Sequence, residues 1–271
     1  MTAIITLLTD FGQRDSYVAE LKGVLLSAAP DARIVDITHE IAQGNIFAAQ
    51  YVLGRTWQRF PAGTVHLAVV DPTVGTRRRI IAAANHGHRF VAPDNGLLTP
   101  VLTGASVVDV PVPSDASPTF QGRDVMAPVA ALLAQGSSLE RVGRVISNPI
   151  RTPVPTPRVD PQGLVGCVVY VDRFGTLVTN LRELADAEAG ATPRVGKTEN
   201  ESSVAGSELA GTAAVVVAGR AIPLRKTFAD VAPGELVAFV GSGGTIEIAV
   251  RDGSAAEHLG VKEGGEVRLR A

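Results

Sequence analysis

Three carboxylates follow closely on apolar segments that are typical of buried β-strands. Asp10, Asp71 and Asp94 each lie within a residue or two of such a segment's end, and His39 follows a fourth segment. In open α/β sheets, ligands bind beyond the carboxyl ends of the strands. If these strands are neighbours, the carboxylates converge on one crevice, where they accept hydrogen bonds from a sugar diol or an amino group, or attract a cationic ligand.

Each of these residues also has an ordinary structural interpretation. An aspartate in a turn caps its own backbone, so any one of these carboxylates alone is open to a purely structural role. His39 is either a ligand or base or a structural residue, whereas His66, within an apolar segment, is expected to be structural. His86 and His88 fall in a predicted turn and are expected to be solvated. The sequence lacks the His, Cys and carboxylate spacing of a metal site, so we expect no metal ion.

The first half of the chain alternates apolar segments with helical periodicity. This alternation predicts an N-terminal α/β layered domain, residues 1–146, with a largely parallel sheet. We expect Asp15 to cap the first helix, which ends before Pro30. Strands are predicted at residues 4–8, 33–37, 65–70, 80–84 and 89–92, and helices at residues 15–29, 45–57 and 124–134.

The second half of the chain has a different pattern. Residues 147–162 contain five prolines and no helical period, which is typical of a linker. Residues 163–271 contain short apolar or alternating runs separated by glycines, which predicts a small antiparallel β-barrel domain. Strands are expected at residues 165–171, 212–217, 236–240, 245–250 and 266–269. Residues 187–211, rich in small and polar residues, are expected to form a surface loop with no assigned function.

The charge and amino-acid composition of the chain indicate what kind of molecule it binds and where it is located. The chain has 271 residues and a net charge of −2. Its one tight basic cluster is residues 77–79, so we expect a small-molecule partner and no nucleic acid. A single cysteine, Cys167, fits a reducing compartment. The chain has no apolar run of about 18 residues and no basic n-region, so we expect a cytoplasmic protein without a membrane span.

Six motifs occur in an order that resembles one known family. They are TDFGQRDSYV (9–18), VVDPTVGTRRR (69–79), APDNGLL (92–98), TFQGRDVMAP (119–128), VDRFGTLVTN (171–180) and GSGGTIEIAV (241–250). Together they resemble the S-adenosyl-L-methionine (SAM) hydroxide adenosyltransferases, or adenosine-forming SAM hydrolases, which are related to the fluorinase and chlorinase. The resemblance implies an α/β domain, a C-terminal β-barrel and a homotrimer whose active sites lie between subunits. It implies SAM as substrate and no cofactor.

The resemblance also implies a reaction. Water or hydroxide attacks the 5′ carbon of SAM, with the sulfonium R-epimer as a candidate form of the substrate, and releases adenosine and L-methionine. The family holds this nucleophile with an Asp, an Arg and a His, which correspond to Asp71, Arg78 and Gln121. A glutamine cannot exchange a proton near neutral pH, but it donates and accepts hydrogen bonds. The alternatives are therefore a slow hydrolase, a hydrolase that uses Asp71 alone, and a SAM- or adenosine-binding protein with little turnover.

Two further interpretations remain open. A structural trimer with a vestigial site would bind no SAM. A SAM-dependent halogenase is disfavoured, because these relatives carry an aromatic residue where this chain has Asp71, and a carboxylate repels a halide. The fluorinase also has a serine where this chain has Gly122.

The substrate-binding residues implied by the resemblance come from both halves of the chain. Asp10 corresponds to the residue that holds the ribose hydroxyls, and Asp15 with Tyr17 to the methionine amino group. Phe174 corresponds to the adenine-packing part of the barrel, unless it is a core aromatic. The remaining candidates are Asn95 in its turn motif, Thr176 in place of the family's usual Asn, and Ser242, Gly243 and Val250 in the strands that close the adenine pocket. Ser242 alone would be interpreted as a turn residue.

Overall fold

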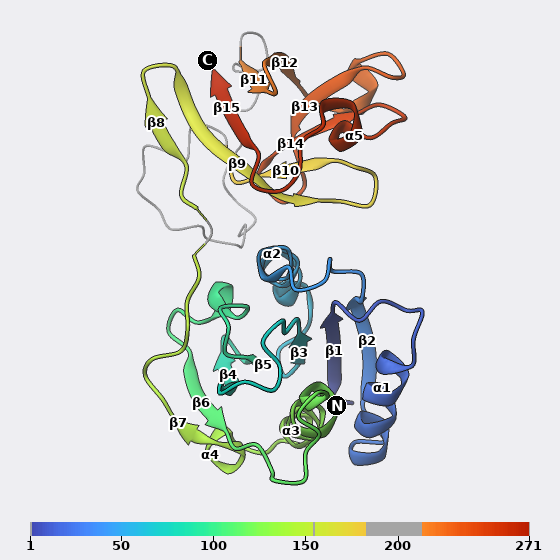
Figure 1. Ribbon diagram of the computed structural model, residues 1–271, viewed down its shortest axis with the longest axis vertical. Coiled ribbons are helices and arrows are strands. Elements are labelled where there is room, and N and C mark those ends of the chain that lie inside the picture. Colours follow the sequence, from blue (N-terminus) through green and yellow to red (C-terminus); the bar gives the residue numbers. More distant parts are fainter. Residues whose placement is uncertain (1, 154, 183–212, 271) are drawn as a thin grey trace. The chain divides into compact units, whose positions relative to one another are not determined.

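The computed structural model describes residues 2–153, 155–182 and 213–270. The chain divides into two compact units, Met1–Pro153 and Val154–Ala271 (Figure 1). The division falls inside the proline-rich segment 147–162. The predicted loop at residues 187–211 lies outside the described residues.

The first unit is built on a seven-stranded sheet in the order β2-β1-β3-β5-β4-β6-β7. The strands β2, β1, β3 and β5 are parallel, and β4, β6 and β7 add antiparallel pairs at the other end. The parallel half carries the predicted carboxylates at its carboxyl ends. The strands are β1 (Ile4–Thr9), β2 (Arg33–Thr38), β3 (Val65–Val69), β4 (Ile80–Asn85), β5 (His88–Pro93), β6 (Ser106–Val110) and β7 (Arg144–Val145).

Helices cover this sheet and form the core with it. The apolar positions of α1 and α3 pack against the strands in one buried cluster that includes Leu21, Leu25 and Leu133. These positions recur three or four residues apart, as a helix that buries one face requires. The helices are α1 (Tyr17–Ala28), α2 (Ile46–Thr56), α3 (Ala127–Ala134) and α4 (Leu139–Val142), with 3₁₀ turns at Trp57–Arg59 and Thr99–Val101.

Two predicted helix starts are wrong. The residue before α1 is Ser16, not Asp15, and it has a helical backbone and no capping hydrogen bond from its side chain. Its hydroxyl instead donates to Glu20 Oε1 at 2.7 Å. Asp15 therefore lies outside the helix and is exposed. The predicted helix at residues 124–134 begins earlier, as a π-helix at Gly122–Met126 that continues into α3.

A buried histidine pair lies within the sheet. His66 on β3 is 1% exposed, and the prediction that it is structural is confirmed. His88, expected to be solvated, is 6% exposed because it begins β5 and packs beside His66. Thr6 Oγ1 lies 2.8 Å from His66 Nδ1, and His66 Nε2 lies 3.1 Å from His88 Nδ1. Burial, together with the charge of His88, lowers the pKa of His66 to about 3.

This pair makes folding stability depend on pH. The unfolded chain takes up a proton at His66 below its ordinary pKa of 6.5, whereas the folded chain does not until about pH 3. The free energy of unfolding should therefore fall by about 1.4 kcal/mol per pH unit as the pH decreases through this window. Urea unfolding of the protein and of His66→Gln between about pH 7.5 and pH 5 checks this linkage. Equal pH slopes for the two proteins would contradict it.

The second unit is a closed β-barrel. Its strands follow the order β10-β14-β13-β12-β11-β15-β9-β8, and a further pairing of β10 with β9 closes a seven-stranded barrel with β8 outside it. All pairs are antiparallel except β12 with β13. The strands are β8 (Arg158–Asp160), β9 (Gly163–Val171), β10 (Leu177–Thr179), β11 (Ala214–Val217), β12 (Arg220–Arg225), β13 (Leu236–Val240), β14 (Ile246–Val250) and β15 (Glu266–Arg270), with α5 at Ala255–Leu259 and a 3₁₀ turn at Phe228–Asp230.

The predicted fold class, an α/β domain with a β-barrel domain, is confirmed. Three strands of the second unit were not predicted. β10 is only three residues long, β12 contains Pro223, and β8 lies in the segment interpreted as a linker.

Candidate active site

A buried ion pair lies directly beyond β3. Asp71 follows this strand, and the loop that returns to β4 carries Arg78. Arg78 Nε donates to Asp71 Oδ2 at 2.8 Å, Arg78 Nη2 contacts the same oxygen, and both side chains are only 6% exposed. Asp71 Oδ1 accepts from the backbone N–H and hydroxyl of Thr73 at 3.3 and 3.1 Å. Each oxygen of Asp71 thus accepts two hydrogen bonds, so the carboxylate serves to hold Arg78.

Gln121 completes a three-residue cluster. Arg78 Nη2 donates to Gln121 Oε1 at 2.5 Å, and Gln121 is 7% exposed. Because an arginine can only donate, this contact directs the amide oxygen to Arg78 and leaves Gln121 Nε2 as a donor. Within the described residues, Arg78 Nη1 is buried without a hydrogen-bond partner. The cluster therefore offers N–H donors to a water or an anion and contains no free base.

The backbone beside Gln121 is unusual. The π-helix Gly122–Met126 begins at the next residue, and single-turn π-helices are frequent at functional sites. A Cβ atom on Gly122 would lie 3.2 Å from Val69 Cγ1 and 3.6 Å from Phe11 Cζ. Glycine therefore lets this turn pack directly against β3 and the loop after β1, which brings Gln121 to the end of the sheet.

An aromatic cluster adjoins Gln121. The ring centroid of Phe120 lies 5.7 Å from that of Phe11 and 5.4 Å from that of Tyr17. Tyr17 is 49% exposed, so one side of the cluster faces solvent. These rings provide an apolar wall next to the polar cluster.

A network of charged side chains, which was not predicted from the sequence, contacts the Phe120 ring of this aromatic cluster. Arg123 donates to Asp124 Oδ1 at 2.6 Å and to Glu20 Oε2 at 2.7 Å, and its guanidinium lies 4.8 Å from the centre of the Phe120 ring. Asp124 Oδ2 also accepts from the Ser117 N–H at 2.9 Å. The network ties the first turn of α1 to the π-helix. The adjacent residues Arg123 and Asp124 were the only signal in the sequence.

Asp10 lies at the end of β1 and interacts with Asp71. Its Oδ2 accepts from the Gly44 N–H at 2.8 Å. Burial raises the pKa of Asp10 and the nearby charge of Asp71 adds to this rise, against the hydrogen bond from Gly44. The expected convergence of strand-end carboxylates therefore holds for Asp10 and Asp71.

The third strand-end carboxylate has a different role. Asp94 is 1% exposed, accepts from Arg79 Nε at 2.8 Å and accepts from the Ile150 N–H at 2.7 Å. The next residue, Asn95, donates from Nδ2 to Val70 O at 2.8 Å. Asp94 is thus used structurally, and Asn95 braces the backbone directly before Asp71.

The binding candidates of the second unit lie partly on its surface. Phe174 is 74% exposed in the β9–β10 turn, so its interpretation as a core aromatic is wrong. Asp172 Oδ1 holds this turn by accepting from the Phe174 and Thr176 N–H groups at 2.9 and 2.8 Å. Thr176 is buried.

The remaining barrel candidates also include both exposed and buried residues. Ser242 and Gly243 are exposed in the turn between β13 and β14. The side chain of Val250 is buried in the barrel core.

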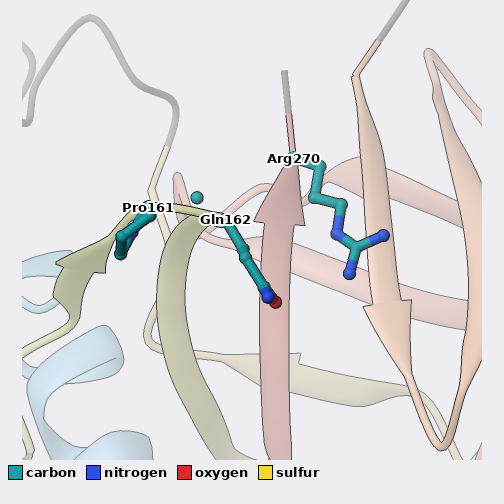
Figure 2. A pocket seen from close by; sticks show the side chains of 4 residues that line it. Pro161, Gln162 and Arg270 are labelled. Carbon is teal, nitrogen blue, oxygen red and sulfur yellow. The ribbon is translucent and has the colours of Figure 1, made fainter.

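A separate hollow of about 500 Å³ lies at the β8–β9 turn of the barrel. Figure 2 shows its lining, in which Pro161, Gln162 and Gly163 come from the turn and Arg270 from the end of β15. It contains none of the predicted site residues. Across the described parts of the chain, no cluster of His, Cys, Asp and Glu is arranged to hold a metal ion. The same residues contain no helix that is long and apolar enough to span a bilayer.

Comparison with known families agrees with this architecture. Residues 5–143 match the SAM hydroxide adenosyltransferase N-terminal domain, and residues 166–268 match the C-terminal domain of the same family. The chain belongs to the SAM hydroxide adenosyltransferase family.

Individual relatives cover nearly the whole chain. An (R)-S-adenosyl-L-methionine hydrolase of Thermus thermophilus is 38% identical over 97% of both chains, and that of Salinispora tropica is 37% identical over 100% of this chain and 98% of the other. A fluorinase of Actinopolyspora mzabensis is 32% identical over 98% of this chain and 96% of its own. The crystal structure of an uncharacterized conserved protein from Thermotoga maritima superposes with a TM-score of 0.84 at 35% identity, covering 98% of this chain and 100% of the other.

Proposed function

We propose that this protein hydrolyses SAM, with the R-epimer at sulfur as a candidate substrate, to adenosine and L-methionine. The observation that carries the proposal is the buried cluster of Asp71, Arg78 and Gln121, in which Arg78 Nη1 has no partner among the described residues. The names of the relatives at 37–38% identity support the same reaction.

The proposed chemistry is substitution at the 5′ carbon. A water-derived oxygen forms the new C5′–O bond, the C5′–S bond breaks, and its electron pair stays on sulfur as the neutral thioether of methionine. The positive charge of Arg78 favours deprotonation of the water to hydroxide. The proton that the water loses passes to solvent. Arg78 Nη1 and Gln121 Nε2 donate hydrogen bonds to this oxygen and align it, and alignment of reactants supplies much of the rate. Asp71 keeps Arg78 in place.

The substrate contacts follow from the position and chemistry of each candidate. Asp10 is assigned to the ribose hydroxyls, and its Oδ2 accepts from the Gly44 N–H. Asp15 and Tyr17, both exposed at the start of α1, are assigned to the methionine amino group. Asn95 is assigned an indirect role, because it holds the backbone carbonyl of Val70, directly before Asp71. Phe174, with the barrel residues Thr176, Ser242, Gly243 and Val250, is assigned to adenine. A homotrimer with active sites between subunits and a cytoplasmic location belong to the same proposal.

The second candidate is a SAM- or adenosine-binding protein with little turnover. It is favoured by Gln121, which fills the position of an acid–base group with a side chain that cannot exchange protons. Halogenation is disfavoured by the buried carboxylate of Asp71 at the nucleophile site.

Incubation with SAM that contains both sulfonium epimers separates these candidates. Chromatography with and without chloride should show adenosine and methionine in equal amounts, and the epimer that disappears identifies the substrate. Bound SAM without products would leave the binding protein, and a chlorinated nucleoside would support the halogenase.

The exposed ring of Phe174 provides a test of the adenine assignment. Phe174→Ala should raise KM for SAM by roughly tenfold with a smaller change in kcat, because loss of one stacking ring removes about 1–3 kcal/mol of base binding. Steady-state kinetics measures both values. The matched control is Phe228→Ala, since Phe228 is 43% exposed and packs 4.6 Å from the Phe239 ring within the barrel. Equal KM values for the two variants would remove Phe174 from the adenine site.

A further inference from the structure

A series of linked side-chain contacts, called the relay below, reaches the residue directly before Asp10. His39 follows β2 and is 1% exposed, and its Nδ1 lies 2.8 Å from the Oγ1 of Thr9, the last residue of β1. Its Nε2 lies 3.1 Å from Asp36 Oδ1, and Asp36 Oδ2 accepts from Lys22 Nζ of α1 at 2.6 Å. The relay therefore joins α1, the end of β2 and the end of β1.

The two ring nitrogens of His39 differ in their contacts. Nδ1 shares a hydrogen bond with the Thr9 hydroxyl, in which the tautomer decides which atom donates. Nε2 lies 3.1 Å from Asp36 Oδ1 without a hydrogen bond among the described residues. Thr9 Oγ1 in turn accepts from the Phe11 N–H at 3.3 Å. Side-chain contacts thus hold the two residues on either side of Asp10.

Backbone hydrogen bonds also connect the segment around Asp10 to the loop after β2. Gly12 N–H donates to His39 O at 2.7 Å, and Ile41 N–H donates to Thr9 O at 3.4 Å. A few residues later, Gly44 N–H donates to the Asp10 carboxylate itself. The loop after β1 and the loop after β2 are therefore joined through His39 on one side of Asp10 and through Gly44 on the other.

We propose that His39, with Thr9 and Asp36, is a positioning residue that orients the Asp10 carboxylate toward the ribose of SAM. His39 is 1% exposed, with Nδ1 at the Thr9 hydroxyl and Nε2 beside Asp36, so it acts through these neighbours and not on the substrate itself. The inference rests on the proposed function, in which Asp10 binds the ribose. From the sequence, His39 was open to a role as a ligand or base or to a structural role.

Two substitutions separate the two contacts of the imidazole ring. His39→Asn keeps a polar atom at the position of Nδ1, beside Thr9, and loses the contact with Asp36. His39→Gln keeps a donor near the position of Nε2 and loses the contact with Thr9. Because Thr9 adjoins Asp10, His39→Gln should weaken SAM affinity by roughly tenfold, the size of one net hydrogen-bond contribution, and His39→Asn should weaken it less. The rate constant kcat should change less than KM in both variants.

His66 is a matched control in the same sheet. It is also 1% exposed, and its Nδ1 also lies 2.8 Å from a buried threonine hydroxyl, that of Thr6. Substitution of His66 by Gln removes an equivalent contact but leaves the loop around Asp10 untouched. His66→Gln should therefore lose stability while its affinity for SAM stays at the wild-type value.

Amide hydrogen exchange supplies a measurement that does not depend on SAM. The Gly44 N–H, which donates to Asp10, should exchange faster in His39→Gln than in His39→Asn or His66→Gln. Wild-type exchange at Gly44 in His39→Gln, or an equal loss of SAM affinity in His66→Gln, would overturn the inference. If the wild-type protein neither binds nor hydrolyses SAM, the proposed function fails, whereas exchange at Gly44 still decides whether His39 orients Asp10.

Discussion

Asp71→Asn should lower kcat for SAM hydrolysis by roughly 10²–10⁴-fold, the range seen when a positioned acid–base or electrostatic group is removed. Arg78 is held by Asp71 through two of its nitrogens and by Gln121 through one of them. The neutral amide of asparagine removes the charge partner and one acceptor, so Arg78 no longer keeps its donors on the attacking oxygen. Adenosine affinity should change little, because Asp71 makes no proposed contact with the nucleoside.

Asp94 provides the matched control for this substitution. The adjacent arginine, Arg79, pairs with Asp94 as Arg78 pairs with Asp71. The side chain of Asp94 is 1% exposed against 6% for Asp71, and that of Arg79 is 28% exposed against 6% for Arg78. Removing one partner of a buried ion pair costs about 3–5 kcal/mol, so both variants should unfold at lower denaturant concentration. Only Asp71→Asn should lose kcat by orders of magnitude. Equal losses of kcat in the two variants would show that Asp71 contributes stability alone.

Gln121→His should raise kcat by roughly 10²-fold, the lower end of the contribution of a positioned general base. In the structure the acceptors of the cluster, the Asp71 carboxylate and Gln121 Oε1, already accept hydrogen bonds from Arg78. Deprotonation of the water therefore has no free side-chain acceptor within the cluster. An imidazole at this position adds one. Affinity for SAM should remain close to that of the wild-type protein, since the proposed function assigns Gln121 to the nucleophile and not to the nucleoside.

The pH dependence of the rate shows whether the imidazole of Gln121→His acts as a general base or raises kcat for another reason. The rate of Gln121→His should increase through an apparent pKa near that of an ordinary histidine, about 6.5, and the wild-type profile should lack this step. Gln121→Leu is the control, because it removes the acceptor for Arg78 and adds no base, and its kcat should fall. Turnover in Gln121→His equal to that of the wild type would show that the glutamine already meets the needs of the reaction.

The fold class and most of the helices and strands could be predicted from the sequence. Strand β3 is apolar throughout apart from His66, and the helical period of α1 places Val18, Leu21 and Leu25 on one face. Such patterns depend on local spacing and are readable without a structure. Two of the missed strands, β10 and β12, lack that signal. β10 has three residues, and β12 is interrupted by Pro223 and is defined by its partners on either side.

The sequence also determined which residues to consider at the site, because Asp10, Asp71, Arg78 and Gln121 lie in its motifs. It did not determine which of them have free hydrogen-bonding groups. Asp71 and Asp94 look equivalent as strand-end carboxylates, yet one holds Arg78 beside Gln121 and the other is enclosed by Arg79 and Ile150. That difference depends on contacts between residues far apart in the chain.

The exposure and contacts of His39 and Phe174 became visible only in the folded chain. A lone histidine after a strand has no distinctive local pattern, and its contacts with Thr9 and Asp36 exist because β1 and β2 are adjacent and parallel. A phenylalanine in a sequence is expected to be buried, but the turn held by Asp172 exposes Phe174. Local spacing predicts which elements form, whereas exposure and hydrogen-bond partners depend on which elements the fold brings together.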